Sequence, residues 1–185
     1  MAAPTPQEAA ELGRQLLQEL CCERKDLDVA RCEKLISQGA DLGFDKDRSL
    51  SPLLRATRHG LPGVVTAILD RGVDVNEKDA WGWTALMVAS SVGWADMAQL
   101  LIDRKADIHA VSDKEETPFS LAQKSGAKAT EEVLIKAERR RQQDLAALDS
   151  LAAQFQEALM NAHIVQEPIK VGHALRLVSK GGAPS

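Results

Sequence analysis

TALMVASSVG, residues 84–93, decides the fold, because the same pattern stands 33 residues earlier and again 33 residues later. The matching segments are SPLLRATRHG at 51–60 and TPFSLAQKSG at 117–126. The segments that follow keep the same step, and they place an aspartate in phase at Asp41, Asp74 and Asp107. A fixed period of this length is typical of proteins built from stacked structural units. The sequence therefore predicts a repeat protein of four units.

Each unit carries the local features of a helix, a turn and a second helix. A hydroxyl residue suited to capping a helix opens each segment and a glycine suited to a left-handed helix end closes it; these residues are Ser51, Thr84, Thr117, Gly60, Gly93 and Gly126. A large and a small side chain three residues apart share one helix face; the pairs are Leu53 and Ala56, Leu86 and Ala89, and Phe119 and Ala122. Aliphatic residues such as Leu101 and Ile102 then mark the second helix.

This pattern resembles the ankyrin repeat family. The likeness covers residues 27–136, and its specific elements are TALMVASSVG with LLIDRKADIH, and SPLLRATRHG with AILDRGVDVN. The resemblance implies an all-α ankyrin-repeat solenoid of helix-turn-helix units with hairpin-like loops. The residues after the repeats add a predicted long C-terminal helix and an extended tail. It also implies a curved stack that binds other proteins.

Four regions are expected along the chain. They are a diverged N-terminal capping repeat over 1–46, three ankyrin repeats over 47–136, a C-terminal helix over 137–162, and an extended or disordered tail over 163–185.

The family's usual histidine after Thr-Pro-Leu is replaced by Leu54, Met87 and Ser120. Lys105 stands at a glycine position, where a positive φ costs roughly 1 kcal/mol. Ser49 and Glu115 replace the glycine of the hairpin tip.

All three tryptophans lie within DAWGWTALMVASSVGW, residues 79–94, although aromatic residues make up only 3% of the chain. The resemblance places Trp81 and Trp83 beside the hairpin-tip Gly82, at variable positions that line the concave groove. Tryptophan is enriched among interface hot spots, so we expect these two indoles to contact a partner. The alternative is that both rings fold over adjacent hairpin tips. Trp94 follows a helix-ending glycine, and we expect it to pack between helices.

The same variable positions in the neighbouring units give the predicted groove a mostly basic character. Besides the two indoles, the predicted partner-binding residues at these positions are Arg48, Leu50, Arg58, His59, Lys114 and Lys124, and Arg104 is added from a further recurring position near the end of the second helix. An aromatic and basic groove on a chain of net charge −4 favours a protein partner with apolar anchors next to acidic groups. The alternative is that each cation is simply solvated. Nucleic-acid binding is a weaker interpretation, and it would show a steep dependence on salt.

The segment after the repeats predicts one long helix or two joined helices, because no proline or glycine occurs from Ala129 to Ala162. Within it, apolar residues step by three and four along a short coiled-coil seam; they are Leu145, Leu148, Ala152, Phe155, Leu159 and Ala162. Leu145, Leu148, Phe155 and Leu159 form a candidate docking helix for a partner or a second copy. The alternative is that this helix caps the last repeat. The basic run ERRR, residues 138–141, is expected to be a solvated helix face, and the alternative is a nuclear-import or phosphate-contact element.

The tail alternates apolar and polar residues from Pro168 onward, as a strand does. A single strand finds no partner strand in an all-helical chain, so it either adds to the sheet edge of another protein or lies extended or disordered.

Chemistry is scarce in this sequence, and we expect no enzyme. The four histidines stand far apart and none has a cysteine or carboxylate at metal-ligand spacing, so no metal site is expected. No glycine-rich phosphate loop or nucleophile motif occurs, so neither a cofactor nor a small-molecule substrate is expected. An odd count of three cysteines favours reduced thiols.

These features favour a non-enzymatic protein-binding module that uses the concave groove, with the C-terminal helix and tail as a second contact. The alternative is a permanent structural subunit of a large assembly. The start of the chain resembles neither a signal peptide nor a transit peptide. No segment has the roughly 18 apolar residues that span a bilayer. A cytoplasmic location is therefore expected, with a nuclear or organellar one left open.

Overall fold

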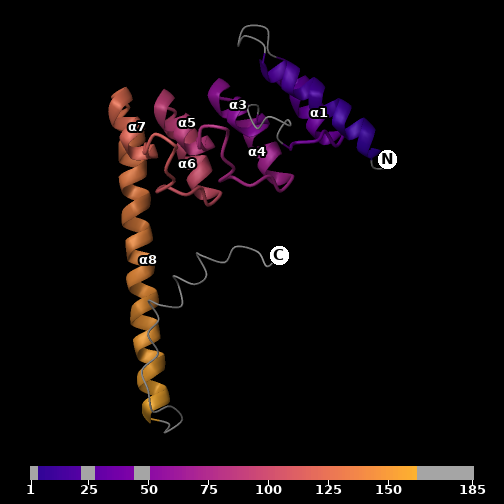
Figure 1. The fold of residues 1–185 in the computed structure, drawn as a ribbon. Helices are drawn as coiled ribbons and strands as arrows, with labels where there is room; N and C mark the ends of the chain where they lie inside the picture. Colours follow the sequence, from indigo (N-terminus) through magenta and orange to yellow (C-terminus); the bar gives the residue numbers. More distant parts are fainter. Residues whose placement is uncertain (1–3, 22–27, 44–50, 162–185) are drawn as a thin grey trace. The chain divides into compact units, whose positions relative to one another are not determined.

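The computed structural model describes residues 4–21, 28–43 and 51–161, and every regular element among them is an α-helix. The helices are α1 (Pro6–Cys21), α2 (Val29–Ser37), α3 (Pro52–His59), α4 (Pro62–Asp70), α5 (Ala85–Val92), α6 (Ala95–Asp103), α7 (Pro118–Ser125) and α8 (Lys128–Asn161). Figure 1 shows the short helices in successive pairs, with α3 and α5 packed next to each other and α7 next to α5. The predicted helix-turn-helix repeat is confirmed.

The predicted caps set the ends of the first helix in each unit. The hydroxyl oxygens of Ser51 and Thr84 accept hydrogen bonds from the backbone N–H groups of Leu54 and Met87, at 3.3 Å in both cases. Thr117 forms a reciprocal capping box with Ser120. Each of these helices ends at a left-handed glycine: Gly60, Gly93 and Gly126. The short helices therefore begin and end where their own residues dictate.

The core lies between successive units and contains the expected aliphatic and alanine positions. Leu53, Leu86 and Leu101 are completely buried. The small residues that let neighbouring helices approach are completely buried as well: Ala56, Ala89 and Ala122. Phe119 differs from Leu53 and Leu86 at the same phase, since 36% of its surface is exposed. No fifth copy of the repeat pattern follows to cover this side chain.

Two residues take the left-handed backbone conformation in place of glycine. Lys105 has φ 72°, whereas Gly72 at the same phase has φ 87°. Glu115 has φ 59°, whereas Gly82 at the tip of the preceding hairpin has φ 74°. The turns of the last unit therefore keep the geometry of the others, and the two side chains bear the steric strain.

The N-terminal unit departs from the others in the length of its first helix. Helix α1 has 16 residues, whereas α3, α5 and α7 have eight each. Leu16 and Leu20 of α1 are buried in the same core as Cys32 and Ile36 of α2. The unit therefore contributes an apolar face to the stack, which is what a terminal repeat needs.

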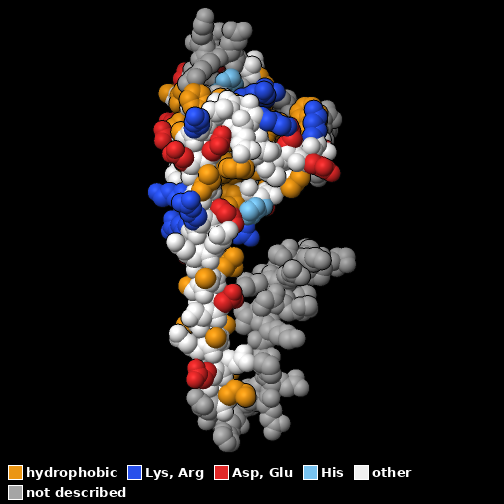
Figure 2. Space-filling view, turned by 90° about the vertical axis from the view of Figure 1, so that its left-hand side faces the viewer, with side chains coloured by type: hydrophobic (Ala, Val, Ile, Leu, Met, Phe, Trp, Pro, Cys, Tyr) orange, Lys and Arg blue, Asp and Glu red, His pale blue; other side chains and the backbone are white. Residues whose placement is uncertain are grey.

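Helix α8 is a single helix of 34 residues, so the segment after the repeats is one helix and not two. By its contacts the chain divides into two units, residues 1–137 and 138–185. In the first ten residues of α8, Thr130 and Leu134 are buried, and Leu134 belongs to the repeat core. From Leu145 onward the large apolar side chains of α8 are mostly exposed (Figure 2). The predicted tail, residues 163–185, lies outside the described residues.

Candidate partner-binding pocket

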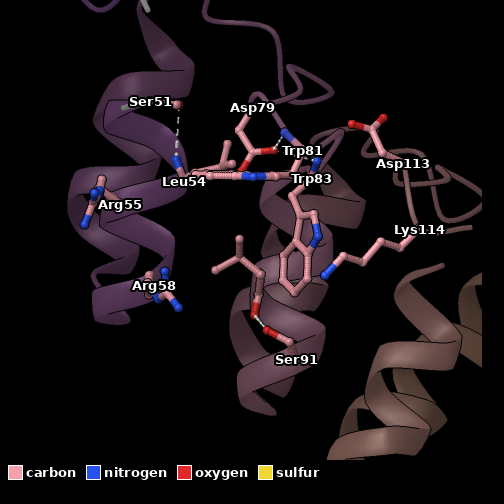
Figure 3. Close-up of a pocket in the computed structure, with 11 residues that line it drawn as sticks. Ser51, Leu54, Arg55, Arg58, Asp79, Trp81, Trp83, Ser91, Asp113 and Lys114 are labelled. Atoms are coloured by element: carbon pink, nitrogen blue, oxygen red, sulfur yellow. Dashed lines mark hydrogen bonds between the residues drawn. The ribbon is translucent and has the colours of Figure 1, made fainter. Parts of the chain in front are cut away.

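A pocket of about 570 Å³ opens across the second, third and fourth units. Its lining comes from α3, from α5 and from the two hairpins that precede α5 and α7; the residues are Ser51, Leu54, Arg55, Arg58, Asp79, Trp81, Trp83, Val88, Ser91, Asp113 and Lys114. Figure 3 shows Arg55 and Arg58 on α3 at one side and Lys114 at the other, with the tryptophans between them. Four predicted groove residues, Trp81, Trp83, Arg58 and Lys114, are thus brought together.

The hairpin that carries the two tryptophans is fixed by Asp79. One carboxylate oxygen of Asp79 accepts hydrogen bonds from the backbone N–H groups of Trp81, at 2.9 Å, and Trp83, at 2.8 Å. The backbone N–H of Asp113 in the next hairpin donates to the carbonyl oxygen of Trp81 at 3.2 Å. A Cβ atom on Gly82 would lie 2.8 Å from the Asp113 side chain, so this close approach of the hairpins requires glycine.

The two indoles differ in how far they are buried. Trp81 is 59% exposed. Trp83 is half-buried and packs against Met87, Ala110 and Leu121. Trp83 therefore has packing contacts inside the stack as well as a place in the pocket lining. Trp81 offers a ligand the larger free surface.

The cations that line the pocket have no ion-pair partner among the residues that the structure describes, whereas two cations outside the pocket have one. Within the described part of the chain, no carboxylate pairs with Arg55, Arg58 or Lys114. The Arg104 guanidinium lies 2.8 Å from the Asp70 carboxylate, and the Lys124 ammonium lies 2.7 Å from that of Glu116. Arg104 and Lys124, both predicted for the groove, therefore neutralise acids of this chain outside the pocket.

His59 is also predicted for the groove, but it links two helices of the stack. Its Nε2 donates to the carbonyl oxygen of Leu20 at 2.8 Å, which ties α3 to α1. The remaining two predicted residues, Arg48 and Leu50, lie outside the described residues. Arg55 was missed from the sequence. It stands three residues before Arg58, so the helical period could have placed both on the same face of α3.

Trp94 packs within the stack, as a structural residue should. It is half-buried among the core residues at the start of α6. Its ring covers Gly60 so closely that a Cβ atom on this glycine would lie 3.1 Å from the Trp94 Cζ2 atom. Trp94 therefore connects the second and third units, away from the pocket lining.

A carboxyl group beside the pocket wall has a perturbed acidity. Burial raises the pKa of Glu77 to about 7, although a hydrogen bond from the Ser51 hydroxyl opposes this rise and the nearby Asp74 carboxylate adds to it. Ser51 caps α3 and lines the pocket. The charge next to the cap therefore changes near neutral pH.

Other chemistry is sparse among the residues that the structure describes. No group of three or more His, Cys, Asp or Glu side chains there is placed to hold a metal ion. Burial raises the pKa of the Cys32 thiol to about 11, with nearby acids contributing, whereas the Cys21 side chain is exposed. No helix in the described segments is long and apolar enough to cross a membrane.

Fold and pocket together define a helical repeat solenoid with a hollow across consecutive units. The sequence pattern of the family described as "Ankyrin repeats (3 copies)" matches residues 53–145. This chain therefore belongs to the ankyrin repeat family. The repeats of this family are protein–protein interaction modules.

Similar proteins match part of this chain. The chain is 34% identical over 82 residues to "Ankyrin repeat, SAM and basic leucine zipper domain-containing protein 1" of Atelerix albiventris, covering 44% of this chain and 17% of that protein. It is 35% identical over 86 residues to "Neurogenic locus notch homolog protein 1" of Xenopus tropicalis, covering 46% and 3%. It is 35% identical over 72 residues to "Protein phosphatase 1 regulatory subunit 27" of Mus musculus, covering 39% and 47%. The matched region thus spans less than half of each relative.

Proposed function

We propose that this protein binds a protein partner through the pocket between its second and fourth units, without catalysing a reaction. The observation that carries the proposal is a set of three cations, Arg55, Arg58 and Lys114, on two sides of an exposed indole, none of which has an ion-pair partner among the described residues. Several other cations of this chain contact groups within it. Arg104 pairs with a carboxylate, and Arg71 donates a hydrogen bond to a backbone carbonyl oxygen.

The chemistry of the pocket selects a segment with an apolar side chain next to carboxylates. The faces of Trp81 and Trp83 provide an apolar contact area. Arginine side chains bind carboxylates through two parallel hydrogen bonds, and such charge-assisted bonds are stronger than neutral ones. Because Arg55 and Arg58 stand opposite Lys114, acidic groups on both sides of the apolar anchor fit best (Figure 3).

The relatives support a binding role in general terms, and one of them is a regulatory subunit by its name. A second candidate function is a permanent structural subunit of a larger assembly. The observation that favours it is the row of exposed apolar side chains on α8, among them Leu148 and Phe155, which a permanent partner would cover.

Fluorescence anisotropy with two labelled peptides, DDLFDD and KKLFKK, tests the pocket. The acidic peptide should bind and the basic peptide should not. Arg58→Ala and Trp81→Ala should each weaken binding of the acidic peptide about tenfold or more. Lys124→Ala removes a cation outside the pocket and should leave the affinity unchanged. Equal binding of the two peptides, or equal effects of the Arg58 and Lys124 variants, would refute the proposal.

A labelled DNA oligonucleotide measured in the same assay separates nucleic-acid binding from peptide binding. If DNA binds more tightly than the acidic peptide, and its affinity falls steeply with salt, the cations serve a phosphate backbone and the proposal is wrong.

A further inference from the structure

The part of α8 beyond the repeats carries an exposed apolar seam. The seam consists of Leu145, Leu148, Ala152, Phe155 and Leu159, which step by three and four along the helix. Leu148 is 49% exposed and Phe155 is 69% exposed, which makes Phe155 the most exposed large apolar side chain among the described residues. Side chains of this size rarely stay in water without a role, and a row of them on a helix is typical of a docking surface.

Over residues 142–161 the seam is bordered by negative charge. From residue 142 to residue 161 the charged residues are Asp144, Asp149 and Glu157, and no lysine or arginine occurs. At 3.6 residues per turn, Asp144 falls on one edge of the seam and Asp149 on the other. Both side chains are exposed. The surface to be covered is therefore an apolar row with a carboxylate on each side.

This charge pattern disfavours parallel pairing of the seam with the same seam of a second copy, and it adds no charge attraction to antiparallel pairing. In a parallel coiled coil, Asp144 of one helix would face Asp149 of the other, and the same repulsive contact would occur twice. An antiparallel pair centred on Ala152 would overlay the apolar residues, but it would bring no cation to either aspartate. Like charges at these flanking positions therefore select against the parallel pair.

The pocket described above has the complementary pattern. It has an indole surface between cations on two sides, with Arg55 and Arg58 on one and Lys114 on the other. None of these cations has an ion-pair partner in the described segments. We propose that the apolar seam of one copy docks in the pocket of a second copy, with Asp144 and Asp149 against the cations. The inference rests on the proposed function, since it names the occupant of that pocket.

Such a contact joins two different surfaces, so it is head-to-tail. Each added copy leaves one free pocket and one free seam, and a head-to-tail contact therefore continues into chains or closes into rings. The expected sign in solution is an average mass that rises above 20.0 kDa with protein concentration. Because charged groups steer the contact, higher salt should lower this average mass.

Sedimentation equilibrium of charge-reversed full-length chains tests the docking. One variant reverses the pocket (Arg55→Glu, Arg58→Glu, Lys114→Glu), and the other reverses the seam (Asp144→Lys, Asp149→Lys). Each variant alone should sediment as a monomer, because its pocket and its seam carry the same sign of charge. An equimolar mixture should associate again, because the seam of each variant then meets a pocket of opposite charge.

The matched control reverses three exposed cations outside the pocket, Lys34→Glu, Lys128→Glu and Lys136→Glu, with the same change in net charge. It should associate like the parent chain. Circular dichroism checks that each variant is folded, and Lys114→Glu alone replaces the triple variant if that one is not. A monomeric parent chain at every concentration overturns the docking. Retained association of the pocket-reversed variant also overturns it, since seam-to-seam pairing would not need the pocket.

The peptide assay separates failure of this inference from failure of the proposed function. If the acidic peptide binds the pocket while the parent chain stays monomeric, the pocket serves another partner, and only the head-to-tail docking is wrong. If the peptide does not bind and the chain is monomeric, both are wrong.

Discussion

Helices α5 and α6 and the distal part of α8 are all regular helices, but they form for different physical reasons. Helices α5 and α6 have eight and nine residues, and helices this short are unstable in water by themselves. Residues 85–90 of α5 are all buried, so packing against neighbouring units holds this helix in place. The distal part of α8 has mostly exposed side chains. Its helical conformation is stabilised by the length of the helix and by a composition rich in alanine, leucine and glutamine, which favour helices.

The difference shows where stability and recognition reside in this chain. In the repeats, most large apolar side chains are committed to the core, and substitutions there act on folding. In distal α8, the apolar side chains take no part in the described repeat core, and substitutions there act on what the helix contacts. The same type of residue therefore has opposite consequences in the two regions.

The largest expected difference between the two regions is the loss of stability when a leucine in each is replaced by alanine. Leu101→Ala removes a completely buried side chain and should lower the free energy of unfolding by roughly 2–5 kcal/mol through the cavity it leaves. Leu148→Ala removes an exposed one and should change it by less than about 0.5 kcal/mol. Denaturant unfolding measures both. Similar losses for the two variants would mean that the seam belongs to the folded core.

The same contrast recurs at smaller scale in the hairpin before α5. Trp83→Ala should destabilise the chain by about 2 kcal/mol, because the half-buried ring packs against Met87 and Leu121. Trp81→Ala should leave the unfolding midpoint nearly unchanged, since its ring is mostly exposed. Thermal unfolding followed by circular dichroism ranks the two. A larger loss for Trp81 would reverse the assignment of packing and recognition within the pocket.

The half-buried carboxyl of Glu77 gives the repeats a pH dependence of intermediate size. Its pKa rises from 4.5 to about 7 on folding, so folding favours the protonated form. This stabilisation is fully present below pH 4.5 and is lost as the pH rises through 7. Because the residue is only half-buried, we expect a loss of about 1 kcal/mol between pH 5 and pH 8, well below the full shift.

Glu77→Gln tests this dependence, because glutamine keeps an oxygen that can accept from the Ser51 hydroxyl. The variant should be more stable than the parent chain at pH 8 and about equally stable at pH 5, as measured by denaturant unfolding. Glu157→Gln makes the same change on an exposed helix position and serves as the control. A parent chain with identical stability at the two pH values would contradict the assignment.

The smallest expected effect lies in the backbone of the last unit. Lys105→Gly should stabilise the chain by less than about 1 kcal/mol, because relief of the left-handed strain exceeds the cost of glycine flexibility. The reciprocal change, Gly72→Lys, places the same strain in the second unit and should destabilise by a similar amount. A Cβ atom on Gly72 would have no other atom within 4 Å, so a clash does not complicate the comparison. Thermal unfolding of both variants checks that the two shifts have opposite signs.

Sequence alone predicted the fold well, because its determinants are local. The period of 33 residues, the capping residues Ser51, Thr84 and Thr117, and the closing glycines each act within a few residues of themselves. Even the strained Lys105 and Glu115 could be predicted, since they stand at positions where other units have glycine.

The pocket could be predicted only in part, because its remaining determinants are contacts between distant residues. Variable positions of the repeat indicated Trp81, Trp83, Arg58 and Lys114. Which cation remains without a partner depends on carboxylates far away in sequence, such as Asp70, which binds Arg104 across 34 positions. The bond from His59 to Leu20 spans 39 positions. The repeat period does not show which of these distant residues pair with each other.

The bonds from Asp79 to the two tryptophan amides have a thermodynamic consequence for whatever enters the pocket. Ordering a loop on binding costs about 1–2 kcal/mol of conformational entropy per residue. Here the Asp79 carboxylate and the neighbouring hairpin hold the backbone that presents Trp81 before any ligand arrives. Little backbone entropy is then lost in the complex. Asp79→Ala should consequently weaken binding while the indole itself is untouched, and isothermal calorimetry should register that loss chiefly as a less favourable entropy.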